Sequence, residues 1–160
     1  LEGVPGVPRL YHVFSRHAFL VEPIKGIAAN QIPKDELNNE FFERMYKVLD
    51  DIHEKGVTHC DLRSAGNTLI TEDHQPWLVD FVASIHQSSK WNFIGRWIFD
   101  QLVEADYGAV LKLKKRLAPD CLTKKEIEKL EHPRSAVERI GRKIGRSVRF
   151  VTRNLFPSKH

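Results

Sequence analysis

The chain has 160 residues, of which 41% are hydrophobic and 29% charged, and its formal net charge is +4. This composition is typical of one soluble domain with a real core, and it excludes disorder throughout. No apolar run approaches the ~20 residues that span a bilayer, and no basic segment precedes an apolar signal core. We therefore expect a cytoplasmic protein.

The two cysteines and eight histidines limit the metal chemistry. Cys60 and Cys121 are far apart and have no zinc-type spacing, so we expect both to be free thiols. No H-E-x-x-H pattern or paired cysteines accompany the histidines, and a transition-metal site is not expected.

The first third of the chain predicts two short strands and a helix. A Gly/Pro-rich start, Leu1 to Pro8, leads into strands at 9–14 and 18–22. From Asp35 to Lys55, apolar residues recur at steps of three and four, which predicts a helix with one buried face that ends at Gly56. That face consists of Leu37, Phe41, Met45, Leu49 and Ile52.

The stretch from His59 to Phe81 carries the most chemical information. Asn67 opens one short apolar run and Asp80 closes the next, so an antiparallel hairpin would place both side chains at the same end. Asp61 enters from the loop just before. Two carboxylates and an amide oxygen suit Mg²⁺, which shares its remaining positions with water and phosphates. Each residue alone is more often a turn former, so the combination carries the inference.

Two further helices are predicted downstream. Residues 91–104 are apolar on most sides and predict a helix buried at the centre, with Trp91 and Trp97 in the core. Residues 106–117 continue as a helix with Val110, Leu113 and Leu117 inward. Its basic residues are expected largely outward, as a solvated face: Lys112, Lys114, Lys115 and Arg116.

The remaining segment begins with a capping box and ends in a basic tail. Thr123 and Glu126 have the S/T-x-x-E spacing that begins a helix, here a short one ending near Pro133. Residues 134–160 hold eight basic residues and one acid, a net charge of +7, so the rest of the chain carries −3. Their pattern is amphipathic. Docking on an anionic membrane surface or a protein, and plain packing on the domain, both remain open, while nucleic acid is not expected because aromatic residues are few.

The His59 to Phe81 stretch resembles the protein kinases, whose catalytic loop reads H-R-D-x-x-x-x-N and is followed by D-F-G. The resemblance implies that Asp61 is the base that orients the acceptor hydroxyl and that Asn67 and Asp80 are the metal ligands. It further implies that His59 supports the loop and that Arg63 contacts the transferred phosphate.

Three departures from the protein-kinase pattern indicate which branch of the superfamily this sequence resembles. Five residues instead of four separate Asp61 from Asn67, so we expect a bulge, for which Gly66 offers positive φ. Cys60 replaces the loop arginine, and Val82 replaces the glycine of D-F-G. This combination resembles small bacterial kinase-like proteins grouped with lipopolysaccharide kinases and RIO-type kinases.

The resemblance implies an α+β fold, mainly α. It corresponds to a kinase-like C-terminal lobe with a catalytic-loop β-hairpin and remnant strands of the small lobe. The implied division is remnant strands and hinge at 1–34, the lobe at 35–133, and the basic tail helix at 134–160. Glu22 and Ile24 would then lie in the hinge that binds the adenine of ATP, although a strand ended by Pro23 explains this segment equally well.

The resemblance also implies the function. The implied function is that of an ATP-dependent kinase that uses Mg²⁺ or Mn²⁺. Its acceptor would be a hydroxyl group, either of protein Ser/Thr or of a sugar or lipopolysaccharide-type group. No glycine-rich loop is present and the first lysine, Lys25, follows the hinge, so we expect an inactive fragment. The alternative is a non-catalytic kinase-like scaffold that docks on a membrane or a partner through its basic tail. Docking on a membrane would make the cytoplasmic protein peripheral at the inner face of the membrane.

Overall fold

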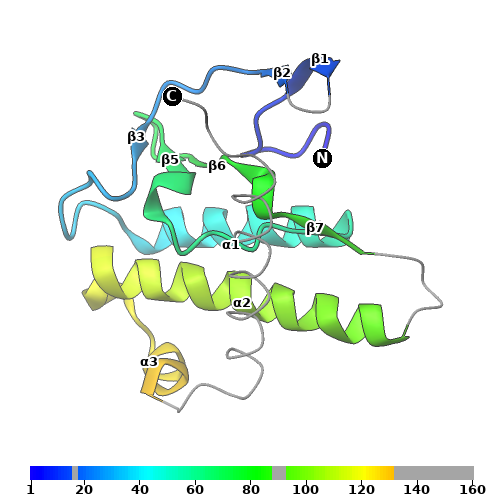
Figure 1. Ribbon diagram of the computed structural model, residues 1–160. Coiled ribbons are helices and arrows are strands. Elements are labelled where there is room, and N and C mark those ends of the chain that lie inside the picture. Colours follow the sequence, from blue (N-terminus) through cyan, green and yellow to red (C-terminus); the bar gives the residue numbers. More distant parts are fainter. Residues whose placement is uncertain (16–17, 88–92, 132–160) are drawn as a thin grey trace, which may run out of the picture.

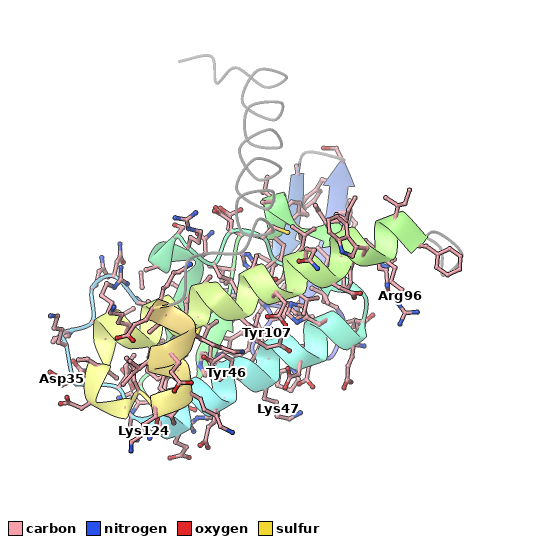
Figure 2. All side chains as sticks on the ribbon, turned by 90° about the horizontal axis from the view of Figure 1, so that it is seen from below. Asp35, Tyr46, Lys47, Arg96, Tyr107 and Lys124 are labelled. Atoms are coloured by element: carbon pink, nitrogen blue, oxygen red, sulfur yellow. The ribbon has the colours of Figure 1, made fainter. Side chains whose placement is uncertain are left out.

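The computed structural model describes residues 1–15, 18–87 and 93–131 and shows a small α+β fold (Figure 1). Helices α1 (Asn39–Glu54) and α2 (Phe93–Leu117) lie side by side, and the short α3 (Lys124–Glu131) follows beyond α2 (Figure 2). Within the described ranges, no helix is both long and apolar enough to cross a membrane. The predictions for Trp91 and for the tail at 134–160 lie outside the described residues.

The strands form three small antiparallel sheets. β1 (Leu10–Ser15) pairs with β2 (Ala18–Val21), close to the predicted strands. β5 (Thr68–Ile70) and β6 (Pro76–Leu78) form the predicted hairpin. The sequence did not predict β3 (Ile27–Ala28), which joins β5, or the pairing of β4 (Val57–Thr58) with β7 (Ile85–His86).

The N-terminal segment covers the outer edge of the β5–β6 hairpin. The amide of Leu78 donates to the carbonyl of Gly6 over 2.7 Å, so β6 is bonded on both edges. Gly6 has φ +83°, and a Cβ there would lie 2.6 Å from Val48 Cγ2. Only glycine fits this position, because a side chain would collide with α1.

Helix α1 supplies most of the core, as its sequence pattern predicted. It begins at Asn39, four residues later than predicted, because Asp35 has a left-handed backbone (φ 63°) and Asn38 caps the helix. The Asn38 side chain accepts from the amide of Phe41 over 3.0 Å. Gly56, at φ +73°, ends the helix as predicted.

Residues 93–117 form one continuous helix, α2, whose two ends differ. The prediction that its beginning is buried is wrong: Phe93 is 81% and Trp97 49% exposed, and Ile94 is exposed as well. Burial begins at Phe99 and continues to Leu117, where Val110, Leu113 and Leu117 face inward as predicted. Apolar composition alone did not show which end of the helix has neighbours to pack against.

Lys114 also departs from the expected solvated face, because it is buried and pairs with Glu126 over 3.0 Å. Glu126 belongs to the predicted capping box, which is confirmed. Its carboxylate accepts from the Thr123 amide (2.7 Å), and the Thr123 hydroxyl accepts from the Glu126 amide (3.3 Å). Burial would raise the pKa of Glu126, but the bonds from Thr123 and Lys114 together hold it below its usual value. The ion pair thus fixes α3 against α2.

Candidate functional site

The loop after β4 is anchored by a buried histidine. His59 is fully buried, and its Nε2–H donates to the carbonyl of Val79 over 3.0 Å. Its ring also lies 4.6 Å from that of Phe81, between centroids. Burial lowers the pKa of His59, so the neutral ring is favoured and the proton sits on Nε2. The side chain therefore ties this loop to the strand end at Val79.

Asp106, in the middle of α2, holds the same loop from the opposite side. Its carboxylate is 2% exposed and accepts the amide of His59 (2.8 Å) and that of Cys60 (2.9 Å). It also accepts from Nε2 of His53 in α1 over 3.1 Å. Hydrogen bonds to a charged group contribute about 1.5–3 kcal/mol each. One carboxylate thus links α1, α2 and the loop.

The backbone at Cys60 is strained. Its φ of 64° is left-handed, a conformation that costs about 1–3 kcal/mol for a residue other than glycine. The bond from its amide to Asp106 and the contact between its Sγ and the Thr58 hydroxyl (3.2 Å) hold it there. Burial raises the pKa of the thiol to about 11, so Cys60 is a neutral, free thiol. Such strain is kept where a loop must present the next residue, here Asp61, in one orientation.

Asp61 and Asn67 lie together at the other end of the loop. The Asn67 amide nitrogen donates to the backbone carbonyl of Asp61 (3.0 Å) and to its carboxylate (3.3 Å). The extra residue between them is accommodated in a 3-10 turn at Ala65–Asn67. The expectation of a positive φ at Gly66 is wrong, because the turn needs none there and the left-handed residue is Cys60.

Asp80 joins this pair through its neighbour Val79. The amide of Val79 donates to the carbonyl of Asn67 over 2.9 Å, while its own carbonyl accepts from His59. The next residue, Asp80, is exposed and has a left-handed backbone (φ 64°, ψ 65°), after which the chain turns into the 3-10 segment Phe81–Ala83. The fold therefore gathers the loop that starts at His59, Asn67 and Asp80 around one strand end.

The donor set at this strand end fits a hard divalent cation. Because the Asn67 amide nitrogen points to Asp61, its oxygen lies on the other side of the amide group. This amide and the carboxylates of Asp61 and Asp80 carry oxygens, the ligand type that Mg²⁺ prefers. No group of three or more His, Cys, Asp or Glu with metal-binding geometry occurs among the described residues.

Arg63 lies on the outer side of the loop, exposed to solvent. It lines a pocket of about 250 Å³ together with Leu62 and with residues of α2, among them Lys112 and Arg116. Its charge is therefore placed beside α2, two residues after Asp61.

The two residues of the expected hinge lie just after β2. The amide of Glu22 donates to the carbonyl of Arg9 (2.8 Å), and its carboxylate accepts from the Arg9 amide (3.1 Å). These bonds extend the β1–β2 ladder by one pair. Ile24 is half-buried and follows Pro23, which has no amide hydrogen.

Sequence reasoning missed Asp106 and His53. Asp106 was treated as the start of a second helical segment, yet it falls in the buried stripe of α2, between Leu102 and Val110. A carboxylate at a position that periodicity assigns to the core is a signal of a buried hydrogen-bonded anchor. His53 gave no such signal, because its role depends on the packing of α1 against α2.

Parts of this chain are similar to known proteins. Over 82 residues the chain is 34% identical to serine/threonine-protein kinase D of Synechocystis sp., an alignment that takes in 48% of this chain and 16% of that relative. The chain therefore spans a small part of the relative's length. The RIO domain matches residues 2–94, more than half of the chain, and the chain belongs to the RIO-domain family. The matched segment holds Asp61, Asn67 and Asp80, whereas Asp106 lies beyond it.

Proposed function

We propose that this chain carries the catalytic loop and metal-binding residues of an ATP-dependent phosphotransferase that acts on a hydroxyl acceptor. The observation that supports it best is the pair of hydrogen bonds made by the Val79 backbone, one to His59 and one to Asn67. They join the loop that starts at His59 to Asn67 and place the next residue, Asp80, beside them. Membership of the RIO-domain family and the kinase relative support the same class of reaction. Kinases of this superfamily use ATP and Mg²⁺, or Mn²⁺, in general.

Each residue of the site has a proposed role. Asp61 accepts the proton of the acceptor hydroxyl and orients it for in-line attack, while Arg63 offsets charge on the transferred phosphoryl group. Asn67 and Asp80 would hold the metal ion, which supplies Lewis-acid stabilisation of the phosphate oxygens when bound. His59 is a positioning residue. Most of the acceleration in this scheme comes from positioning and electrostatics.

The remaining features of the proposal concern the rest of the molecule. Residues 1–34 would serve as remnant small-lobe strands and hinge, and residues 35–133 as the kinase-like C-terminal lobe. Because the amide of Glu22 is bonded to Arg9, the hinge would offer adenine the Glu22 carbonyl and the Ile24 amide. The acceptor would be a protein Ser/Thr or a sugar hydroxyl. The basic residues at 134–160 would dock on an anionic membrane or a protein.

The test is phosphoryl transfer by the full gene product that contains this chain. We expect Mg²⁺-dependent transfer of the γ-phosphate of ATP, with a loss of at least ~100-fold in Asp61→Asn and Asp80→Asn. The matched control is Asp73→Asn, which removes a carboxylate from the turn at the opposite end of the same hairpin and should keep full activity.

Two outcomes would contradict the proposal. Full Mg²⁺-dependent transfer by Asp80→Asn would remove Asp80 from the metal site. A gene product that neither binds Mg²⁺·ATP nor transfers phosphate would favour a non-catalytic scaffold of the same fold.

A further inference from the structure

A pocket of about 250 Å³ lies between the catalytic loop and the second half of α2. Leu62, Ala65 and Leu113 give it an apolar floor, and Arg63, Lys112 and Arg116 line it with positive charge. Lys112 and Arg116 are four residues apart and so project from the same face of α2. Arg63 comes from the loop and lines the same pocket.

The charge of this pocket is one-sided. Among the described residues that line it, three are cationic and none is acidic. Among the described residues, neither Arg63 nor Arg116 forms an ion pair with a carboxylate. Like charges held close together repel, by about 1 kcal/mol at 4 Å in water and by more at a partly buried site. An anion bound between them would turn this repulsion into attraction.

The favourable interaction of cations with the C-terminal end of a helix explains the position of some of these residues, but not of all. The last turn of α2 holds Lys114, Lys115 and Arg116, and cations there interact favourably with the helix dipole. Lys114 turns away to pair with Glu126. Arg63 does not belong to the helix at all, so the dipole does not explain why it shares a pocket with Arg116.

The size and chemistry of the pocket suit a phosphate group. Drug-sized ligands occupy ~300–1,000 Å³, so a pocket of about 250 Å³ suits a small ligand or one group of a larger one. Guanidinium groups bind phosphate through paired N–H donors, and two of the three cations are arginines. The apolar floor removes water from one side of the bound anion, which strengthens these interactions.

The pocket is also next to the proposed reaction centre, because its lining residue Leu62 directly follows Asp61. We propose that the pocket binds a phosphate group already present on the acceptor, so that a hydroxyl elsewhere on the same molecule reaches Asp61. The acceptor class is then a phosphorylated small molecule of the sugar phosphate type. This inference rests on the proposed phosphotransferase function and names the acceptor of that site.

The experiment is an NMR titration of the full 160-residue chain, without nucleotide or Mg²⁺ and at constant ionic strength. The probes are glucose 6-phosphate, inorganic phosphate and, as the neutral control, glucose. We expect saturable shifts for amides at 62–65 and 109–116 with both phosphates and none with glucose. Arg116→Gln should raise the Kd at least about tenfold, whereas Lys115→Gln, which removes a neighbouring exposed cation outside the pocket, should leave it unchanged.

Three results would overturn the inference: no saturable shift with either phosphate, an unchanged Kd in Arg116→Gln, or an equal rise in Lys115→Gln, which would show diffuse attraction only. The NMR spectrum reports in the same sample that each variant is folded. Because no nucleotide is present, failure of the proposed phosphoryl transfer leaves this result standing. Conversely, if the Arg116→Gln variant of the gene product transfers phosphate to a neutral acceptor as well as the wild type does, that result contradicts this inference and leaves the proposed phosphotransferase function standing.

Discussion

Two antiparallel hairpins in the described part of the chain differ in what lies beneath them. Every described residue of β1 and β2 is exposed, whereas β5 and β6 alternate buried and half-buried residues and pack on α1. Only the second hairpin presents the proposed metal ligands. It is held by Gly6 at one edge, by β3 at the other and by His59 at its end. A hairpin can hold functional side chains in place when neighbouring segments are bonded to its edges and its end.

The largest effect should come from the residue that fixes the loop leading to the second hairpin. Asp106→Ala leaves two buried amides and the ring of His53 without their acceptor, so we expect a loss of about 3–5 kcal/mol in the free energy of unfolding. Urea denaturation followed by circular dichroism measures it. Asp100→Ala, an exposed acid on the same helix, is the control and should change stability by less than about 0.5 kcal/mol.

The two hairpins can be compared directly by one substitution in each. Leu78 in β6 is fully buried and Leu20 in β2 is 50% exposed. We expect Leu78→Ala to cost about 2–5 kcal/mol, because it leaves a cavity against α1, and Leu20→Ala to cost less than about 0.5 kcal/mol. Equal losses in the two variants, measured by urea denaturation, would show that β1–β2 is packed against something as firmly as β5–β6.

Hydrogen exchange tests the same difference without a mutation. The amides of Leu78 and Val79 donate to Gly6 and Asn67 within the packed region, so they should exchange only when most of the structure opens. The amide of Glu22, bonded to Arg9 at the exposed hairpin, should exchange at least about a hundredfold faster through local opening. Comparable rates for the two hairpins would contradict the comparison.

The smallest effect concerns the protonation of His59. Burial lowers its pKa, so the unfolded chain binds more protons than the folded one as pH falls below the ordinary value of about 6.5. The free energy of unfolding should therefore decrease as the pH is lowered through this window, by no more than ~1.4 kcal/mol per pH unit for one proton. His59→Gln, which keeps a donor for Val79, should flatten this slope, and His86→Gln, at an exposed position, should not. An unchanged slope in His59→Gln would show that His59 does not titrate as described.

Local patterns in the sequence predicted much of the fold. The apolar stripe of α1, the stop at Gly56, the β5–β6 hairpin and the capping box at Thr123 all depend on neighbours within a few residues, and all were found. The short strand β3 and the exposed start of α2 were not predicted, because each depends on which distant segments are available for packing.

The same distinction applies to the candidate site. Type and spacing predict Asp61, Asn67 and Asp80 as candidate residues, and the register of β5 with β6 brings together the strand ends next to Asn67 and Asp80. Asp106 acts on the loop across a separation of 46 residues from Cys60, so no local pattern joins them. The ion pair of Lys114 is likewise a tertiary contact that helical periodicity does not show.

The central claim is that Asp61, Asn67 and Asp80 converge on one divalent cation. The most direct measurement is paramagnetic broadening of the amide signals of this chain on titration with Mn²⁺ in the presence of ATP. We predict that residues 61, 67 and 80 broaden together at the lowest Mn²⁺ concentrations and that Asp80→Asn removes the effect at all three. Broadening of residue 80 at a different concentration from residues 61 and 67, or an unchanged response in Asp80→Asn, would contradict the claim.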